Sequence, residues 1–384
     1  MKIAINTLTT TCSRGGSTTY LVNLIKAISR LDYKNSYYLF VSPLNLKLFE
    51  NLGDNFIRII IPLKRDIRLF RVLLEQTYIP WYIRKLKVDL LFSPNNMAVL
   101  FPGCRQVLTM QAPLLIRSLR QQHAPREVSW IKARFYDIAL PLSIKKADLI
   151  VAVSTDIKHR LLQQFAIPDK KIIVIHEGVD LDAFAAKDEN DQSFNCGING
   201  PYILFLSTFY KYKNADKLLL AFAKAKVKYQ IPHKLVFVGK DHGKQRVFLD
   251  TLAGKLGVKE EVQFVGEQPH NRVAGFYRRA DVFVYPSSVE TFGLPVLEAM
   301  ACGVPVIASN RMSLPEVVGD AGVIIDPDNI TTFALALKRV LMDGDLRQSL
   351  IERGYQRVKQ FSWAKTASET LLAFEGCFKN HKEE

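Results

Sequence analysis

The segment from Ala280 to Ser309 constrains the fold more than any other part of the chain. It begins with an apolar run, Val282–Tyr285, which is typical of a strand that is buried on both faces. A polar loop follows, and Pro295 suits the first turn of a helix that we expect over Val296–Cys302. Val304–Ala308 is then the next apolar strand. A strand, a helix and a strand in this order predict a parallel sheet with crossover helices.

Two glutamates lie at one end of this unit. Glu290 lies on the loop between strand and helix, and Glu298 lies one turn into the helix. Open parallel sheets bind ligands in the crevice beyond the carboxyl ends of their strands, where a helix N-terminus offers backbone amides to an anion. Two solvated surface acids are the alternative interpretation of such a pair.

The block EtFGLPvlEAMAcGVPVIA resembles the signature of retaining glycosyltransferase family 4, E-x-F-G-[LI]-P-x-x-E-A-M-A-x-G-x-P-V-[IV]-A. The resemblance extends over nearly the whole chain and is strongest from Tyr202 to Trp363. It implies the α/β GT-B fold, in which two Rossmann-like, doubly wound parallel-sheet domains face each other across a cleft. It also implies an enzyme that moves a hexose of the mannose or glucose type from a nucleotide-sugar donor, such as GDP-mannose, to a saccharide or lipid-linked acceptor. Synthesis of a cell-envelope polysaccharide is the expected pathway.

The length of 384 residues also favours two domains. We expect an N-terminal, acceptor-side domain over 1–184, a linker over 185–200 and a nucleotide-sugar-binding domain over 201–362. The resemblance implies that a last helix, over 363–384, crosses back to the first domain. Apolar runs predict further strands at Lys2–Asn6, Tyr37–Ser42, Ile57–Ile61, Leu90–Phe92, Gln106–Met110, Leu149–Val153, Ile172–Ile175, Tyr202–Leu206, Lys234–Gly239, Val262–Gly266 and Gly322–Asp326.

The resemblance, carried over position by position, assigns donor contacts to both glutamates. Glu298 would accept hydrogen bonds from the ribose hydroxyls, and Glu290 would bind hydroxyls of the sugar ring. Backbone amides around Phe292, Gly293 and Leu294 would lie close to the same sugar.

A lysine and a glycine loop are expected to bind the diphosphate. Lys213 precedes a helix expected over Asn214–Val227, where the family has a lysine, and Gly16 is the second glycine of GGSTTY, which resembles the family loop G-G-x-x-x-Y. Both would stabilise the leaving diphosphate, so the predicted catalytic residues are Glu290, Lys213 and Gly16. The remaining predicted donor contacts are Gly15, Thr208, Lys211 and Gly239. Lys211 would complete the diphosphate site, because Ser207 and Thr208 stand where many members carry an arginine.

Gln111 marks a departure from the family on the acceptor side. Many members have a histidine near the donor sugar in the pattern T-x-H-D, whereas Gln111-Ala112-Pro113 follows the strand here. An amide can bind a sugar hydroxyl but carries no charge, so the sugar and the acceptor stay open. His176 follows another strand, and we interpret it as structural.

Retention of configuration is compatible with two mechanisms. A double displacement needs a carboxylate nucleophile about 5 Å from its partner acid. No carboxylate of the first domain stands out in the sequence, which favours front-face attack, where the leaving phosphate takes the proton of the acceptor. We expect no metal and no other cofactor, because the chain lacks a D-x-D pair beside the phosphates and a histidine cluster with ligand spacing.

Positive charge is concentrated in the first half of the chain. Residues 1–180 contain 26 Lys and Arg against 13 Asp and Glu, which is most of the net charge of +15. An anionic partner is therefore expected. Arg65, Arg68 and Arg71 fit a basic amphipathic helix on an anionic membrane, and equally the solvated face of an ordinary helix. No motif with interleaved aromatic residues favours nucleic acid.

Composition predicts a cytoplasmic location, with possible attachment to the inner face of the membrane. No apolar run is long enough for a spanning helix, the first residues predict a strand instead of a signal peptide, and five scattered cysteines fit reduced thiols.

Two other functions stay open. A GT-B phosphorylase, which requires inorganic phosphate, or a sugar-nucleotide epimerase would share the fold. A non-catalytic binding protein or partner subunit would have lost its site, although Glu290, Glu298, Lys213 and Gly16 are all present.

Overall fold

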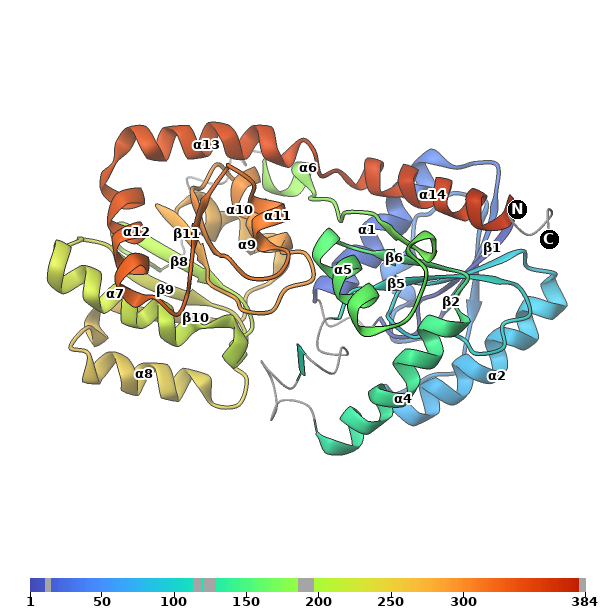
Figure 1. Cartoon of the computed structure of the whole chain (residues 1–384). Helices are drawn as coiled ribbons and strands as arrows, with labels where there is room; N and C mark the ends of the chain where they lie inside the picture. Colours follow the sequence, from blue (N-terminus) through green and yellow to red (C-terminus); the bar gives the residue numbers. More distant parts are fainter. Residues whose placement is uncertain (11–14, 113–118, 121–128, 186–196, 380–384) are drawn as a thin grey trace. The chain divides into compact units, whose positions relative to one another are not determined.

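The computed structural model describes residues 1–10, 15–112, 119–120, 129–185 and 197–379. The chain divides into two compact units, one of Met1–Gly178 with Trp363–Glu384 and one of Val179–Ser362 (Figure 1). Each unit is built on a parallel sheet with helices, which confirms the predicted fold class. The contacts place Val179–Ala185 in the second unit, whereas the sequence prediction placed them in the first domain and the linker. Most of the predicted linker lies outside the described residues.

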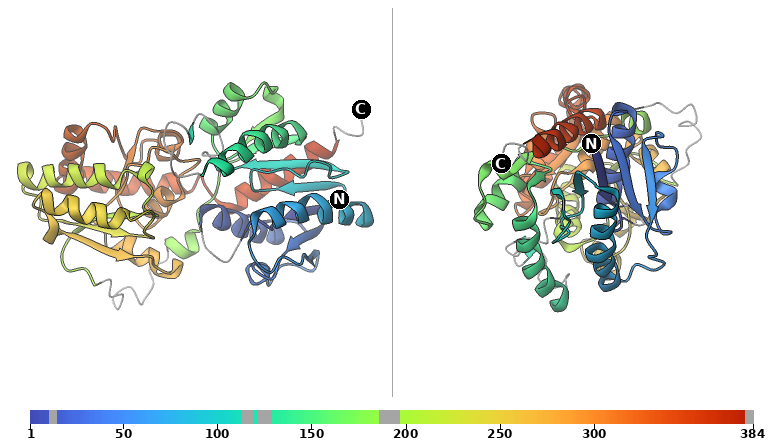
Figure 2. Two further views of the ribbon diagram at one scale, coloured as in Figure 1. Left: turned by 90° about the horizontal axis from the view of Figure 1, so that it is seen from below. Right: turned by 90° about the vertical axis from the view of Figure 1, so that its right-hand side faces the viewer.

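The first unit contains a seven-stranded sheet in the order β3-β2-β1-β4-β5-β6-β7. Its strands are β1 (Lys2–Asn6), β2 (Ser36–Val41), β3 (Phe56–Ile60), β4 (Leu90–Ser93), β5 (Arg105–Met110), β6 (Leu149–Ala152) and β7 (Ile172–Val174), and all neighbours are parallel. Its helices are α1 (Gly16–Leu31), α2 (Arg68–Leu86), α4 (Trp130–Lys146), α5 (Thr155–Gln164) and α14 (Trp363–Lys379), with short 3-10 turns at Leu46–Phe49 and Asp169–Lys171. The last helix, α14, packs beside α1 (Figure 2).

The second unit contains a six-stranded sheet in the order β10-β9-β8-β11-β12-β13. Its strands are β8 (Tyr202–Leu206), β9 (Lys234–Val238), β10 (Val262–Gly266), β11 (Val282–Tyr285), β12 (Val306–Ser309) and β13 (Val323–Ile325), again all parallel. Its helices are α6 (Leu181–Phe184), α7 (Ala215–Tyr229), α8 (Gln245–Lys255), α9 (His270–Arg278), α10 (Leu294–Ala301), α11 (Leu314–Val318), α12 (Ile330–Met342) and α13 (Gly344–Val358), with 3-10 turns at Lys211–Lys213 and Lys259–Glu261.

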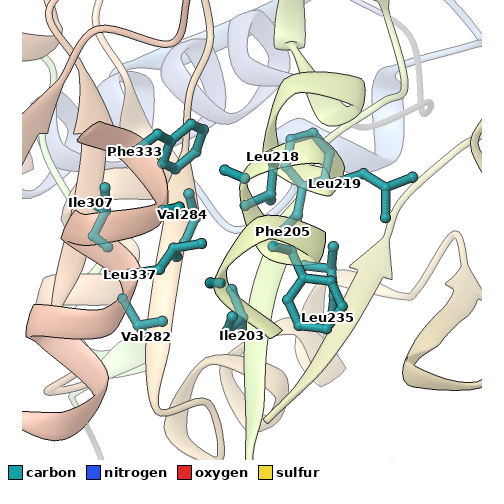
Figure 3. Close-up of a cluster of buried hydrophobic side chains, with 14 of the residues drawn as sticks. Ile203, Phe205, Leu218, Leu219, Leu235, Val282, Val284, Ile307, Phe333 and Leu337 are labelled. Carbon is teal, nitrogen blue, oxygen red and sulfur yellow. The ribbon is translucent and has the colours of Figure 1, made fainter. Parts of the chain in front are cut away.

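Apolar side chains from strands and helices form the core of the second unit (Figure 3). Phe205 of β8 and Val284 of β11 pack beneath Leu218 of α7 and Phe333 of α12, and all four are fully buried. Burying a side chain of this size stabilises the fold by about 1.5–3 kcal/mol. This packing fixes β8 next to β11, and the loops that follow these two strands are fixed with them.

Element ends differ from the prediction by a few residues, for identifiable reasons. The strand predicted from Val304 begins at Val306, because Pro305 has no N–H to donate to the sheet. The helix predicted from Val296 begins earlier, at Leu294, with Pro295 in its first turn.

Candidate functional site

The topological switch point of the second sheet lies between β8 and β11. From β8 the chain continues to β9 on one side, and from β11 it continues to β12 on the other. Open α/β sheets bind ligands beyond the carboxyl ends of the strands at such a point. The loop after β8 carries Lys213 and the loop after β11 carries Glu290, so both predicted residues flank this position.

Lys213 and Glu290 contact each other directly. The Nζ atom of Lys213 forms an ion pair with Oε1 of Glu290 and donates a hydrogen bond of 2.8 Å to the hydroxyl of Tyr285. The two charged side chains are only 12% and 13% exposed. The rings of Tyr212 and Tyr285 lie 5.4 and 5.1 Å from the same ammonium group, within cation–π range. A largely desolvated cation and carboxylate are therefore held at the switch point.

Tyr285 remains neutral in this environment. Burial, followed by the negative charge of Glu290, raises the pKa of the Tyr285 phenol well above its usual value. The neutral hydroxyl accepts a hydrogen bond from Lys213 and orients the ammonium group without removing its charge.

Hydrogen bonds join the two loops that carry these residues. Asn214, in the left-handed conformation at φ +56°, donates from Nδ2 to the carbonyl of Pro286 and to Oγ of Ser288, each at 2.7 Å. The backbone N–H of Ser288 donates to the carbonyl of Tyr212 at 2.7 Å. Glycine and asparagine adopt this conformation most readily, which explains why asparagine suits position 214.

Two serines hold the loop of Glu290 from the other side. The hydroxyl of Ser313 donates to the carbonyls of Glu290 at 3.2 Å and Phe292 at 2.8 Å. The hydroxyl of Ser309 donates to the carbonyl of Ser287 at 2.5 Å. These hydrogen bonds restrain the loop of Glu290 from within the protein, which favours an electrostatically preorganised site.

Two glycines occupy positions that a larger residue could not. Gly239, at φ +141°, follows β9, and an added Cβ would lie 1.9 Å from the carbonyl oxygen of Ser207. Gly293, at φ +117°, precedes α10, and a Cβ there would lie 2.7 Å from the side chain of Leu314. Close approach of the β8 and β9 ends, and of α10 and α11, depends on these glycines.

Glu298 lies on α10 and has a different partner from Glu290. The hydroxyl of Tyr277, on α9, donates to Oε2 of Glu298 at 3.2 Å. Burial raises the pKa of Glu298 to about 7, and the hydrogen bond from Tyr277 only partly opposes this shift. The carboxyl group is therefore close to half-ionised at neutral pH.

The other predicted donor contacts of this unit have varied environments. The side chain of Phe292 is buried against Phe361, with ring centroids 5.7 Å apart, so it serves the core and only its backbone is available for a ligand. Leu294 is also buried. Thr208 is half-buried, and Lys211 is exposed on the 3-10 turn that carries Lys213.

The predicted glycines of the first unit lie at the start of α1. Gly15 is the N-cap residue, and Gly16 is the first residue of the helix. Among the described residues, which do not include 11–14, an added Cβ at either position would meet nothing within 4 Å, and neither glycine has a positive φ. No contact with that part of the chain, and no special backbone conformation, therefore requires glycine at these two positions.

Gln111 follows β5 and is held on both sides. Its backbone N–H donates to Oδ1 of Asn96 at 2.6 Å, and that of Ala112 donates to the same oxygen at 2.8 Å. Its Nε2 donates to Oε1 of Glu177, a buried carboxylate, at 3.5 Å. The departure from the family histidine is thus accompanied by a nearby acid, which the sequence interpretation did not anticipate.

The predicted basic helix is only partly correct. Arg65 precedes α2, whose first residue is Arg68. Arg71 is on the helix, but its side chain is 14% exposed and forms an ion pair of 2.5 Å with Asp66. Arg68 lies over the ring of Tyr136, on α4, at 5.2 Å. These arginines do not form one exposed stripe, because intramolecular contacts engage two of them.

Sequence interpretation missed two hydroxyls beside the predicted acids, those of Tyr285 and Tyr277. Tyr285 carried a signal, since a phenol at the last position of an aliphatic buried strand needs a polar partner at the carboxyl edge. Tyr277 lies in the last turn of α9 and carried no such signal, because only the packing of α9 on α10 brings it to Glu298.

Two family profiles match the chain. The profile described as Glycosyltransferase Family 4 matches residues 14–183, and the one described as Glycosyl transferases group 1 matches residues 186–357. Together they span both units.

Individual proteins resemble the chain as well. The O-antigen chain mannosyltransferase B of Escherichia coli is 31% identical over 251 residues, which are 63% of this chain and 64% of that protein. The chain thus spans less than two thirds of the length of this relative. Sucrose-phosphate synthase of Thermosynechococcus elongatus has the same fold, with a TM-score of 0.77, 21% identity and 99% coverage of both chains. HepE of Anabaena in complex with UDP-glucose also has this fold, with a TM-score of 0.72 and 18% sequence identity. The match covers 98% of this chain and 100% of HepE.

Proposed function

The chain belongs to glycosyltransferase family 4 and has its GT-B fold, and from this premise we propose that it transfers a hexosyl group from a nucleotide-sugar donor to a saccharide or lipid-linked acceptor. The observation that carries the proposal is the pair of Lys213 and Glu290 at the switch point of the second sheet. A cation suits a diphosphate, and a carboxylate acceptor suits sugar hydroxyls.

The residues of the site have distinct proposed roles. Lys213 neutralises the charge that grows on the leaving diphosphate, and Glu290 binds hydroxyls of the transferred sugar. Glu298 accepts hydrogen bonds from the ribose. Gly15 and Gly16 carry no side chain at the start of α1, so a phosphate could approach their backbone closely.

The proposed chemistry is a front-face displacement that needs no metal. The bond between the anomeric carbon and the phosphate oxygen breaks, the bond from the acceptor oxygen to that carbon forms on the same face, and the leaving phosphate takes the acceptor's proton. Lys213, already desolvated beside Tyr285, supplies positive charge at the leaving group. The desolvated ammonium group of Lys213 supports the assignment of leaving-group stabilisation to a side chain instead of a metal ion.

The donor sugar is proposed to be of the mannose or glucose type. A mannosyltransferase of O-antigen synthesis supports mannose, and GDP-mannose is the first donor to test. The complex of HepE with UDP-glucose shows that this fold holds a nucleotide sugar in that protein. A lipid-linked saccharide of a cell-envelope polysaccharide is the proposed acceptor class.

A donor panel tests the proposed function. We expect one nucleotide sugar to raise the melting temperature, because a ligand at a hundred times its Kd stabilises by about 2.7 kcal/mol. Release of nucleotide with that donor should persist in EDTA, and the product should keep the anomeric configuration of the donor. A requirement for Mg²⁺ or an inverted product would refute the mechanism. No response to any donor would favour a non-catalytic binding protein, and dependence on inorganic phosphate would favour a phosphorylase.

Attachment to the membrane is proposed to use a surface on α2 and α4 of the first unit. Exposed apolar side chains there include Leu69 at 78%, Leu73 at 57% and Ile131 at 74%. The cation–π contact between Arg68 and α4 shows that the two helices are neighbours. No described helix has both the length and the apolar character to cross a bilayer.

Vesicle sedimentation tests this surface. The protein is expected to sediment with vesicles containing phosphatidylglycerol, and replacing Leu69 and Leu73 by serine should weaken binding by about tenfold or more, since each buried leucine contributes about 1.5–3 kcal/mol. Val227→Ser is the matched control, because Val227 is 79% exposed on α7 of the second unit. Equal sedimentation of all three proteins would contradict the proposal.

The pH dependence of donor binding should report on Glu298. Because its pKa is about 7, the carboxyl group is mostly protonated at pH 6 and mostly ionised at pH 8, and only the carboxylate accepts from two hydroxyls. Donor affinity should therefore rise about tenfold from about pH 6 to about pH 8, following the ionised fraction.

Two variants isolate this effect. Glu298→Gln should bind the donor with little pH dependence. Glu75→Gln is the control, because burial also raises the pKa of Glu75 to about 7, but on α2 of the first unit. Isothermal titration with an intact nucleotide sugar avoids a phosphate that titrates in this range. If Glu75→Gln rather than Glu298→Gln abolished the pH dependence, the ribose assignment would be wrong.

A further inference from the structure

The first unit contains a second candidate site, a cavity of about 750 Å³ at the amino-terminal edge of its sheet. Its walls are the junction between α4 and β6, the turn and strand around β7, and one face of α14. Arg105, at the start of β5, also lines it. Gln111 and the glycines of α1 lie at the opposite, carboxyl-terminal edge of the same sheet, so the cavity is separate from those positions.

Positive charge dominates the lining. Five basic residues line the cavity, against two acidic residues, Asp148 and Glu369. Both oxygens of Asp148 are engaged, one by Arg105 at 2.6 Å and the other by the backbone N–H of Gln106 at 2.7 Å. Glu369 lies 4.0 Å from Lys365 on its own helix. The carboxylates of the wall therefore already have partners.

Four lysines remain around the cavity, Lys145, Lys146, Lys170 and Lys171. Among the residues that the structure describes, none of the four has a carboxylate within ion-pair distance. Nζ of Lys171 donates to the carbonyl of Lys145 at 3.0 Å, and Nζ of Lys146 lies 4.7 Å from the ring of Phe101. Burial lowers the pKa of Lys171, and the negative charge of Asp148 only partly opposes this shift.

Helix electrostatics explain only half of this cluster. Lys145 and Lys146 are in the last turn of α4, where cations interact favourably with the free carbonyls. Lys170 and Lys171 are on a short 3-10 turn that precedes β7, and no long helix ends there. Bringing them beside Lys145 and Lys146 adds like-charge repulsion, which an anion in the cavity would relieve.

The rest of the lining is apolar. Leu149, Ile173 and Ala373 contribute to the walls, and Leu372 of α14 is 67% exposed beside them. β7 is the edge strand of the sheet, so this wall has no further strand to cover it. A volume of this size is typical of a site for a small molecule.

We propose that this cavity binds a small phosphate ester that carries an apolar group. The phosphate would lie among the four lysines, and the apolar group against Leu149, Ile173 and Leu372. Such a ligand would contact both the positively charged and the apolar parts of the lining, whereas an inorganic anion would contact only the positively charged part. The site is independent of the proposed transfer reaction.

Titration calorimetry with phenyl phosphate, at constant ionic strength, tests the proposal. The wild-type protein should bind phenyl phosphate about tenfold more tightly than inorganic phosphate, because only the ester buries apolar surface. Replacing both Lys170 and Lys171 by alanine should weaken binding of the ester by at least about tenfold, since the phosphate loses two charge-assisted hydrogen-bond donors. Leu372→Asp should weaken it as well, through an exposed position that leaves folding intact.

Two control proteins give the result its meaning. Lys26 and Lys47 are exposed lysines of the same unit that do not line the cavity, and replacing both by alanine should leave binding unchanged. Lys213→Ala should also bind phenyl phosphate normally. The proposal fails if the wild type shows no binding at millimolar ester, if ester and inorganic phosphate bind equally, or if Lys213→Ala loses binding while the cavity variants keep it.

Discussion

Glu290→Gln is expected to reduce the rate of transfer by about 10²–10³-fold, because the loss of one preorganised electrostatic contact to the transition state typically costs that much. The amide keeps the shape of the side chain but loses the charge that binds the sugar hydroxyls. The same change should increase affinity for the nucleoside diphosphate product by about tenfold, since Lys213 no longer has a competing carboxylate. Single-turnover kinetics and calorimetry measure the two effects.

A slower transfer rate together with tighter binding of the nucleoside diphosphate would distinguish a functional ion pair from a purely structural one. A purely structural pair would lose affinity and activity together as the fold loosens. Glu260→Gln is the matched control, because Glu260 is exposed beside the amino end of β10, at the other edge of the same sheet. Transfer by Glu290→Gln near the wild-type rate would refute the assignment of Glu290. If Glu290→Gln bound the nucleoside diphosphate more weakly than the wild type, the proposed competition between Glu290 and the diphosphate for Lys213 would be refuted.

Lys213→Ala is expected to lower kcat by about 10²–10³-fold, because the leaving diphosphate loses its cation. Affinity for the nucleoside diphosphate should fall as well, while affinity for the nucleoside alone should not change. The substitution leaves the largely buried carboxylate of Glu290 without its cation, so the free energy of unfolding should fall by about 3 kcal/mol. Thermal unfolding at the assay temperature must show that the variant remains folded.

Lys228→Ala controls for the loss of charge, because Lys228 is exposed in the last turn of α7, the helix that follows Lys213. Equal losses in both variants would mean that net charge, and not position, affects the rate. An unchanged kcat in Lys213→Ala would remove Lys213 from the catalytic group.

Much of the fold was accessible from local patterns. Buried parallel strands are continuous apolar runs, and runs such as Tyr202–Leu206 and Val282–Tyr285 were located to the residue. The ends of the strands were harder to predict. Pro305 is an example, because its missing N–H shortens the strand without changing the hydrophobicity of the sequence. The predicted basic helix was only partly correct for a different reason, because charge spacing does not reveal that Asp66 pairs with Arg71.

The site was accessible only in part. The sequence placed Lys213 and Glu290 each on a loop after a buried strand, but local patterns do not say which strands are neighbours. The pairing of Gln111 with Glu177 depends in the same way on β5 and β7 lying in one sheet. The lysines of the cavity are scattered over two segments that only the fold brings together.

The sequence by itself determined that this chain forms parallel α/β units and that Lys213 and Glu290 lie at the carboxyl ends of strands. Only the tertiary structure decided that they meet, across 77 residues of sequence, with Tyr285 beside them. The reason is physical. Burial patterns depend on each strand alone, whereas the adjacency of β8 and β11 results from packing apolar faces of distant segments into one core.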